Sequence, residues 1–358
     1  MLNPQEEKEL KAAAAHGAAP DEVVREARRL LEQAHKVKWP LSAAEALKRA
    51  AGAVAKAARA PRGPVGTRIE SNEIDPADLQ LVEKIGRSKQ AVVYKCMQKS
   101  KGRTLAVKIL SARAAADVEA RNSFIRESRN AARLVHPNIV RIWGVAPFKD
   151  TLLLAMEYVD GGSVADLLAA RQRLEPREAV RIIRAAAEGL AYAHKQGFIH
   201  RDIKPHNILL GRDGQVKIAD MGIARRNADL EAAFAEAGRA YGTPYYLSPE
   251  QVRGDPDTDF RADIYSLGAT FNQMLAGRPP FASPDPQSLY KMHLNAPVPD
   301  PRRFVPELPE SLFHILEKAL AKKPADRFPN CEAFIKALDQ TALAERAKPP
   351  AQPPAQGL

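Results

Sequence analysis

The spacing of apolar residues changes twice along this chain. In the first sixty residues apolar side chains, most of them alanine, recur every three or four positions, which predicts helices. From Leu79 onward short runs of Val, Ile and Leu alternate with polar residues, as is typical of strands, and after Gly162 the helical spacing returns. The pattern predicts a short helical module, a strand-rich lobe and a helical lobe, in that order.

Three helices are expected in the N-terminal module. The first begins at Asn3-Pro4-Gln5-Glu6, where an N-cap, an N1 proline and a capping glutamate coincide, and it ends at Gly17. The second is expected from Asp21 to Lys36, and the third runs from the capping box at Ser42 to Pro61. The apolar faces are expected at Val24, Ala27, Leu31 and Ala34 in the second helix and at Leu47, Ala51, Val54 and Ala58 in the third.

The two lobes are outlined by clear periodic segments. The expected strands are Leu81–Ile85, Ala91–Cys96, Leu105–Leu110, Ile139–Val145 and Leu152–Tyr158, with one helix from about Glu119 to Leu134. The clearest helices of the second lobe are Pro176–Lys195 and Ala262–Leu275. We therefore expect a module over 1–60, a linker over 61–77, a domain over 78–342 with lobes 78–158 and 160–342, and a Pro/Ala/Gln-rich tail over 343–358.

One short stretch concentrates groups that suit phosphoryl transfer. His200-Arg201-Asp202 supplies a carboxylate that accepts a proton, and Lys204 supplies a cation for a phosphoryl group. Asn207 and Asp220 supply the hard oxygen ligands that Mg²⁺ prefers. Ile208-Leu210 and Val216-Ile218 flank these residues with strand-like runs, which makes an accidental grouping improbable.

These motifs resemble those of the eukaryotic-type protein kinase family, in its bacterial serine/threonine branch, over about Leu79 to Leu338. The resemblance implies an α+β, bilobal protein kinase fold, with ATP and Mg²⁺ as cofactors. It implies that Asp202 accepts the proton of a protein Ser or Thr hydroxyl, and that Asn207 and Asp220 bind the metal. The implied catalytic residues are Asp202, Lys204 and Thr243.

The same resemblance implies a nucleotide site. Lys108, on a predicted strand, would hold the α- and β-phosphates and pair with Glu127 of the following helix. Glu157-Tyr158-Val159 matches the hinge that binds adenine, with Met156 as the gatekeeper. The full set implied is Ile85, Gly86, Ser88, Val93, Ala106, Lys108, Glu127, Glu157, Val159 and Leu209.

Two motifs depart from the family pattern. The glycine-rich loop reads Gly86, Ser88 and Ala91, so two of its three glycines are missing, and we expect weakened nucleotide binding because glycine lets backbone amides approach phosphates. Met221 replaces the Phe of the Asp-Phe-Gly triplet, and its flexible side chain is expected to fill the same apolar position.

The segment Gly242–Glu250 matches the part of the family that receives a peptide, so the resemblance implies protein substrates and argues against a small-molecule phosphotransferase. It also implies a buried ion pair between Glu250 and Arg327, and an anchoring role for Asp263 beneath the catalytic loop. A pseudokinase that acts as a scaffold or nucleotide sensor stays as the alternative, since the glycine-rich loop is degraded.

The predicted activation loop, between Ile223 and Gly242, contains neither Ser nor Thr. In the family, the Arg of His-Arg-Asp pairs with a phosphorylated loop residue. Three alternatives follow: an acidic residue of the loop replaces the phosphate, Tyr241 is modified, or a regulatory partner such as the N-terminal helices orders the loop. The acidic candidates are Asp229, Glu231 and Glu236.

Composition narrows the class of protein further. No apolar run approaches the ~18 residues of a membrane helix, so we expect a cytoplasmic protein without a membrane segment. Cys96 and Cys331 are far apart and lack neighbours at metal-binding spacing, which argues against disulfides and zinc. A cleft that holds a polyphosphate accounts for much of the net charge of +11, so no nucleic-acid partner is expected. The basic stretch between Lys36 and Arg59 is interpreted as a solvated face, with an acidic partner as the alternative.

Overall fold

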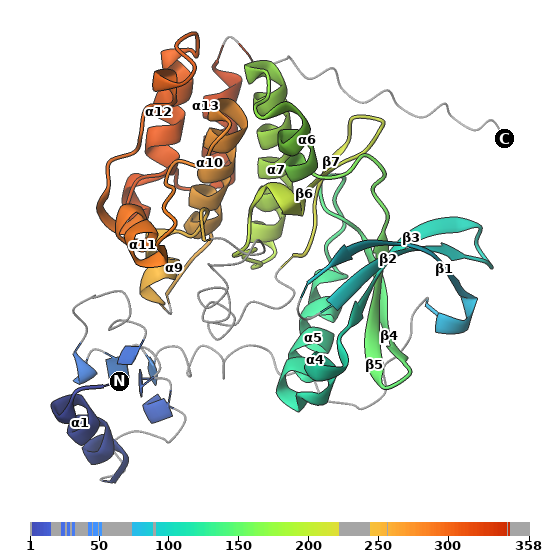
Figure 1. Cartoon of the computed structure of the whole chain (residues 1–358), viewed down its shortest axis with the longest axis horizontal. Helices are drawn as coiled ribbons and strands as arrows, with labels where there is room; N and C mark the ends of the chain where they lie inside the picture. The colour runs from blue at the N-terminus through green and yellow to red at the C-terminus, as the bar shows by residue number, and fades with distance from the viewer. Residues whose placement is uncertain are drawn as a thin grey trace.

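The architecture is a bilobal domain preceded by a small helical module (Figure 1). The computed structural model describes residues 2–15, 74–88, 91–221, 244–255, 257–341 and 343, together with residues 23–25, 27–28, 31–32, 42–44, 46–48 and 50–51 of the N-terminal region. Among these residues, no helix combines the length and the apolar character that a membrane crossing requires.

The first lobe is built on one five-stranded antiparallel sheet. The strands are β1 (Leu79–Arg87), β2 (Ala91–Gln98), β3 (Arg103–Leu110), β4 (Ile142–Phe148) and β5 (Thr151–Glu157), in the spatial order β1-β2-β3-β5-β4. All five predicted strands are present. The fourth begins later than predicted because Ile139 and Val140 pair instead with Ile218 of the second lobe, where the Val140 amide donates to the Ile218 carbonyl at 2.9 Å.

Each face of this sheet contributes to a buried apolar cluster. One face packs on α4 (Ala112–Ala116) and α5 (Val118–Ala131), which bring Phe124 and Ala131 into the main core. The other face forms a smaller cluster in which Ile74, from the segment before β1, packs near Trp143. A helix that lies on a sheet in this way can carry charged groups toward the junction of the lobes.

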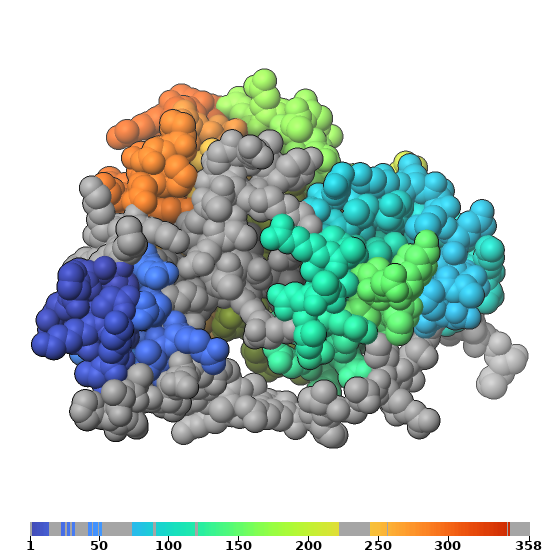
Figure 2. Space-filling view, turned by 60° about the horizontal axis from the view of Figure 1, so that its bottom comes forward, coloured from blue at the N-terminus to red at the C-terminus, as the bar shows by residue number. Residues whose placement is uncertain are grey.

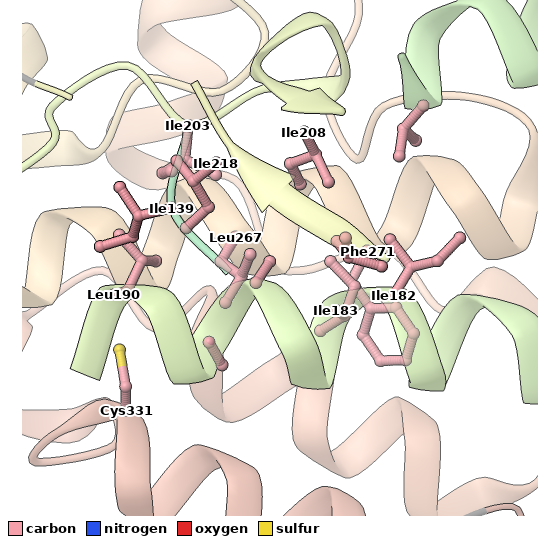
Figure 3. Packing of buried hydrophobic residues seen from close by; sticks show 14 of the residues in the cluster. Ile139, Ile182, Ile183, Leu190, Ile203, Ile208, Ile218, Leu267, Phe271 and Cys331 are labelled. Carbon is pink, nitrogen blue, oxygen red and sulfur yellow. The ribbon is translucent and has the colours of Figure 1, made fainter. Parts of the chain in front are cut away.

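The second lobe is mainly helical and centres on α7 (Pro176–Lys195) and α10 (Arg261–Ala276). Ile182, Ile183 and Leu190 of α7 are fully buried against Leu267 and Phe271 of α10 (Figure 3). Both helices match the predicted segments to within a residue at each end. The other helices are α6 (Val164–Arg171), α9 (Pro249–Arg253), α11 (Pro286–Asn295), α12 (Glu310–Ala319) and α13 (Cys331–Asp339).

Short elements carry the chemistry between the two lobes. A two-stranded hairpin, β6 (Ile208–Leu210) and β7 (Val216–Ile218), follows the 3-10 turn η2 (Pro205–Asn207). Three further 3-10 turns are η1 (Pro76–Asp78), η3 (Pro301–Arg303) and η4 (Pro324–Asp326). The β6–β7 hairpin places the residues around Asp202 beside those around Asp220.

The N-terminal module has a core of its own. Helix α1 (Pro4–Ala15) contributes Leu10, and helical residues from the second and third segments complete the cluster. Figure 2 shows the described residues of the module as a separate dark-blue group. The buried members of this cluster are Leu10, Val23, Ala27, Leu31, Ala43, Ala46 and Ala50.

The predicted faces of the second and third helices are partly wrong. Val23 is buried and Val24 only half-buried, while Ala46 and Ala50 are buried in place of Leu47 and Ala51. An alanine-rich helix offers little contrast in side-chain size, so a face shifted by one residue costs little and the sequence does not define it sharply. Ala34, Val54 and Ala58 lie outside the described residues.

Candidate active site

Asp202 lies at the centre of a compact polar group. Its Oδ2 atom accepts a hydrogen bond from Nζ of Lys204 at 2.9 Å, and both side chains are about a quarter exposed or less. The side-chain amide of Asn207 donates to the Asp202 carbonyl at 2.7 Å and to Oδ2 at 3.2 Å. The predicted base, cation and metal ligand therefore lie in direct contact.

Asp263 anchors the backbone of this loop, as the family resemblance implied. Its side chain is fully buried and accepts hydrogen bonds from the backbone amides of His200 at 2.8 Å and Arg201 at 2.7 Å. Burial alone would raise the pKa of Asp263, but the hydrogen bond from His194, with a smaller contribution from the His200 backbone amide, lowers the pKa below its usual value. The carboxylate is ionised at neutral pH and is a strong acceptor for both amides.

Two residues of the site have left-handed backbone conformations. Arg201 has φ of +65° and Asp220 has φ of +57°, a region that costs non-glycine residues about 1–3 kcal/mol. Such conformations persist only where the surroundings hold them in place. Here the Asp263 carboxylate accepts the Arg201 amide, and the amide and the carbonyl of Ala219, the residue before Asp220, are both hydrogen-bonded.

The backbone contacts of Ala219 bring the two predicted metal ligands, Asn207 and Asp220, together. The Ala219 amide donates to the Asn207 carbonyl at 2.9 Å, and its carbonyl lies 2.8 Å from Nε2 of His200. The loop that carries Asn207 and the loop that carries Asp220 therefore converge.

Lys108 makes a different ion pair from the one expected. Its Nζ atom lies 2.8 Å from Oδ1 of Asp220, whereas Glu127 accepts a hydrogen bond from Ser123 one turn earlier on α5. Within the described part of the chain, no ion pair joins Lys108 to Glu127. Lys108 therefore pairs with the predicted metal ligand Asp220 in this structure.

The ionisation of Asp220 follows from this contact. Burial would raise the pKa of its carboxyl, but the charge and hydrogen bond of Lys108 outweigh burial, with further contributions from His200 and Lys204, and the pKa lies below its usual value. Asp220 is therefore a carboxylate at neutral pH.

The donor set fits a magnesium ion. The amide oxygen of Asn207 and the carboxylate of Asp220 are hard oxygen ligands. The hydrogen bond from Asn207 to Asp202 uses the side-chain nitrogen of Asn207, not its oxygen. Mg²⁺ needs few protein ligands because it keeps waters and binds phosphate oxygens.

The expected adenine pocket is lined by residues of one apolar cluster. Ala106 pairs with Met156 across β3 and β5, and both are buried in the main core together with half-buried Val93, Val159 and Leu209. Ile85, the remaining apolar member of the predicted set, is 44% exposed on β1.

Glu157, at the predicted hinge, is held by two contacts that the sequence did not suggest. Its carboxylate lies 3.1 Å from Nζ of Lys217 on β7 and accepts the amide of Arg141 at 3.1 Å. These contacts tie the end of β5 to the β6–β7 hairpin, and the Glu157 amide also donates to the Arg141 carbonyl at 2.8 Å.

The β1–β2 loop is closed by Ser88. Its hydroxyl accepts a hydrogen bond from the Ala91 amide at 3.1 Å, and its own amide donates to the Ala91 carbonyl at 2.8 Å. An amide engaged in this way is not available to a phosphate oxygen, which gives the predicted loss of affinity a structural cause.

We expect the double substitution Ser88→Gly and Ala91→Gly to tighten Mg-ATP binding about tenfold, a gain of ~1.4 kcal/mol. The change frees the Ala91 amide and restores backbone freedom at both positions. Calorimetric titration of the parent and the variant with Mg-ATP measures the effect. Unchanged affinity in the variant would show that the loop sequence does not limit nucleotide binding.

The predicted ion pair beneath the peptide-docking segment is confirmed. The Nη1 and Nη2 atoms of Arg327 donate to the carboxylate of Glu250, at 2.6 and 2.7 Å, and both side chains are buried. Gln251, which the sequence analysis did not single out, donates from its side-chain amide to the Arg201 carbonyl at 2.9 Å. Thr243 lies outside the described residues.

Met221 is buried, at 4% exposure, in the core cluster that also contains Phe124 of α5. Its apolar position agrees with the prediction made from the sequence.

The protein kinase domain model matches residues 79–337, which is most of the chain. The chain belongs to the protein kinase family. The chain is 37% identical over 271 residues to the serine/threonine-protein kinase PrkC of Bacillus subtilis, a match that covers 75% of this chain and 41% of PrkC. It therefore spans about two fifths of that relative's length.

Solved structures agree with this assignment. The chain matches the crystal structure of the Mycobacterium tuberculosis PknI kinase domain with a TM-score of 0.60 and 34% identity, over 76% of this chain and 99% of the PknI chain. It also matches Rad53 residues 1–466 in complex with AMP-PNP, with a TM-score of 0.61 and 27% identity, over 73% and 64% of the two chains.

Proposed function

We propose that this protein is a serine/threonine protein kinase that transfers the γ-phosphoryl group of ATP to hydroxyl groups of proteins. The observation that carries the proposal is the convergence of Asp202, Lys204 and Asn207 with Asp220 through the backbone of Ala219. The name of PrkC supports the same activity, and the AMP-PNP complex of Rad53 supports a nucleotide as the donor.

In this proposal Asp202 orients the substrate hydroxyl and accepts its proton, which makes the oxygen a better nucleophile. Lys204, 2.9 Å from the same carboxylate, is placed to stabilise negative charge on the phosphoryl group as it moves between oxygens. The backbone hydrogen bonds from His200 and Arg201 to Asp263 keep Asp202 in position while the reaction proceeds.

ATP would supply the phosphoryl group, and a Mg²⁺ ion would neutralise part of the phosphate charge. Asn207 and Asp220 are the residues proposed to bind the metal, and Lys108 is proposed to exchange its contact with Asp220 for phosphate oxygens. Phosphoryl transfer of this kind depends on positioning and charge, which are what these residues provide.

Substrates with Ser or Thr are proposed because Lys204 and the segment around Thr243 match the serine/threonine branch. Among the described residues of that segment, Leu247 is buried with Val252, Tyr290 and Leu294, so a packed platform supports it. A platform of this kind favours an extended peptide over a small molecule.

The test is a phosphate transfer assay with the full chain, radiolabelled ATP, Mg²⁺ and basic and acidic protein substrates. We expect label on Ser and Thr after acid hydrolysis, and none with Asp202→Asn, which keeps the shape of the side chain and removes the base. ATP binding without transfer by the parent protein would favour the pseudokinase alternative. Equal transfer by parent and variant would contradict the role of Asp202.

A further inference from the structure

A chain of contacts beneath the catalytic loop ends at a cysteine. Oδ2 of Asp263, which accepts the His200 amide, also lies 2.8 Å from Nε2 of His194 at the end of α7. On the other side of the imidazole, Nδ1 of His194 lies 3.6 Å from Sγ of Cys331. Figure 3 shows Cys331 at the start of α13 with its sulfur directed toward α7.

The three side chains of this series, those of Asp263, His194 and Cys331, are shielded from solvent. Asp263 and Cys331 are fully buried, and the His194 side chain is 8% exposed. Polar groups in such a place need partners, because water cannot replace a missing hydrogen bond. The contacts of each group therefore constrain the others.

The ionisation of Asp263 determines which atoms carry the hydrogens in the series Asp263, His194 and Cys331. Asp263 is ionised, so Nε2 of His194 carries the hydrogen that it donates to the carboxylate. In a neutral imidazole Nδ1 is then an acceptor. Burial raises the pKa of the Cys331 thiol well above its usual value, so Sγ keeps its hydrogen and can donate it to Nδ1.

A Cys, His and Asp in this order could suggest a nucleophilic site, but the surroundings argue against one. No surface of Cys331 is exposed, and a thiol that keeps its proton is a poor nucleophile. The series instead contacts the catalytic loop, because Asp263 accepts hydrogen bonds from the backbone amides of His200 and Arg201.

We propose that Cys331 is a positioning residue for phosphoryl transfer. Its thiol fixes the His194 tautomer that donates to Asp263, and Asp263 in turn holds the backbone that precedes Asp202. The proposal rests on the proposed role of Asp202 as the base. It connects the start of α13 to the loop that carries the reacting group through side chains that touch at each step.

The left-handed conformation of Arg201 makes the catalytic loop sensitive to changes at Asp263. Arg201 has φ of +65° and is held there by the Asp263 carboxylate. If the His194 ring turns to its other tautomer, a bare nitrogen faces the carboxylate and the two repel. The carboxylate then shifts or loses contacts, and the loop relaxes away from the geometry that Asp202 needs.

The test compares Cys331→Ala, Cys331→Ser and Cys96→Ala in the full chain. Cys96→Ala is the matched control, because Cys96 is equally buried but lies on β2 of the first lobe. We expect Cys331→Ala to lower kcat about fivefold with KM for ATP unchanged, the size of effect that one lost hydrogen bond has. Serine keeps a donor on a shorter bond, so Cys331→Ser should fall between alanine and the parent.

A spectroscopic readout separates positioning from packing. The ¹⁵N spectrum of the His194 ring should show hydrogen on Nε2 alone in the parent and in Cys96→Ala, and a mixture of tautomers in Cys331→Ala. A parent ring with its hydrogen on Nδ1, or a Cys331→Ala protein with the kcat of Cys96→Ala, would overturn the proposal. An inactive parent would instead contradict the proposed function, so the two failures are distinct.

Discussion

Replacing Asp220 by asparagine is expected to lower phosphoryl transfer about 10³-fold, as happens when a charge that stabilises the transition state is removed. Asp220 is a carboxylate at neutral pH and lies 2.8 Å from Nζ of Lys108. Asparagine keeps the shape but has no charge, so it weakens metal binding and leaves Lys108 without its counter-charge. Initial rates at saturating Mg-ATP measure the loss.

Asp213→Asn is the control for this substitution. Asp213 lies in the exposed turn between β6 and β7, on the hairpin that precedes Asp220, where it accepts a hydrogen bond from the Gln215 amide. Asparagine can accept that bond as well, so the control should retain full activity. Raised Mg²⁺ concentrations should recover part of the Asp220→Asn activity if metal binding is what the variant lacks, and a variant as active as the control would refute the assignment.

Arg327→Ala is expected to lower the stability of the kinase domain by about 3–5 kcal/mol, because it leaves the buried carboxylate of Glu250 without a partner. Arg327 also donates to the carbonyls of Ala321, Arg261 and Lys322, so several acceptors lose their donor at once. Thermal unfolding should show a fall in Tm of about 10 °C for a domain of this size.

Arg302→Ala is the matched control for that prediction. Arg302 also pairs with a carboxylate, that of Asp300, but at the surface, where water and salt screen the charges. Its Tm should stay close to that of the parent. Because a buried pair costs desolvation, the double variant Arg327→Met with Glu250→Gln should be more stable than Arg327→Ala. Equal Tm values for Arg327→Ala and Arg302→Ala would contradict the argument.

Sequence patterns predicted most of the domain because strong local signals agree with the tertiary structure. The run Ala91–Cys96 is apolar and β-branched and becomes β2, and the 20-residue segment Pro176–Lys195 becomes α7 with the same bounds. The Glu250–Arg327 pair and the role of Asp263 were predicted from the family resemblance, which supplies contacts across 77 and 63 residues.

Other contacts depend on how elements are rotated, which spacing does not determine. Lys108 and Asp220 are 112 residues apart, and their ion pair depends on how the two lobes bring β3 and the segment after β7 together. Cys331 and His194 are 137 residues apart, so the sequence showed only two isolated residues. In the N-terminal module the choice between Val23 and Val24 depends on small differences that an alanine-rich helix does not encode strongly.

The backbone conformation of Arg201 determines at which stage the free energy for arranging Asp202 is required. Its left-handed conformation is unfavourable, and the Asp263 carboxylate compensates for it inside the folded lobe. The loop is thus preorganised: the free energy needed to arrange Asp202 is spent once, when the chain folds, and not in each turnover. Substrates meet a base whose surroundings need little reorganisation, and mutations that relax Arg201 would return that cost to every catalytic cycle.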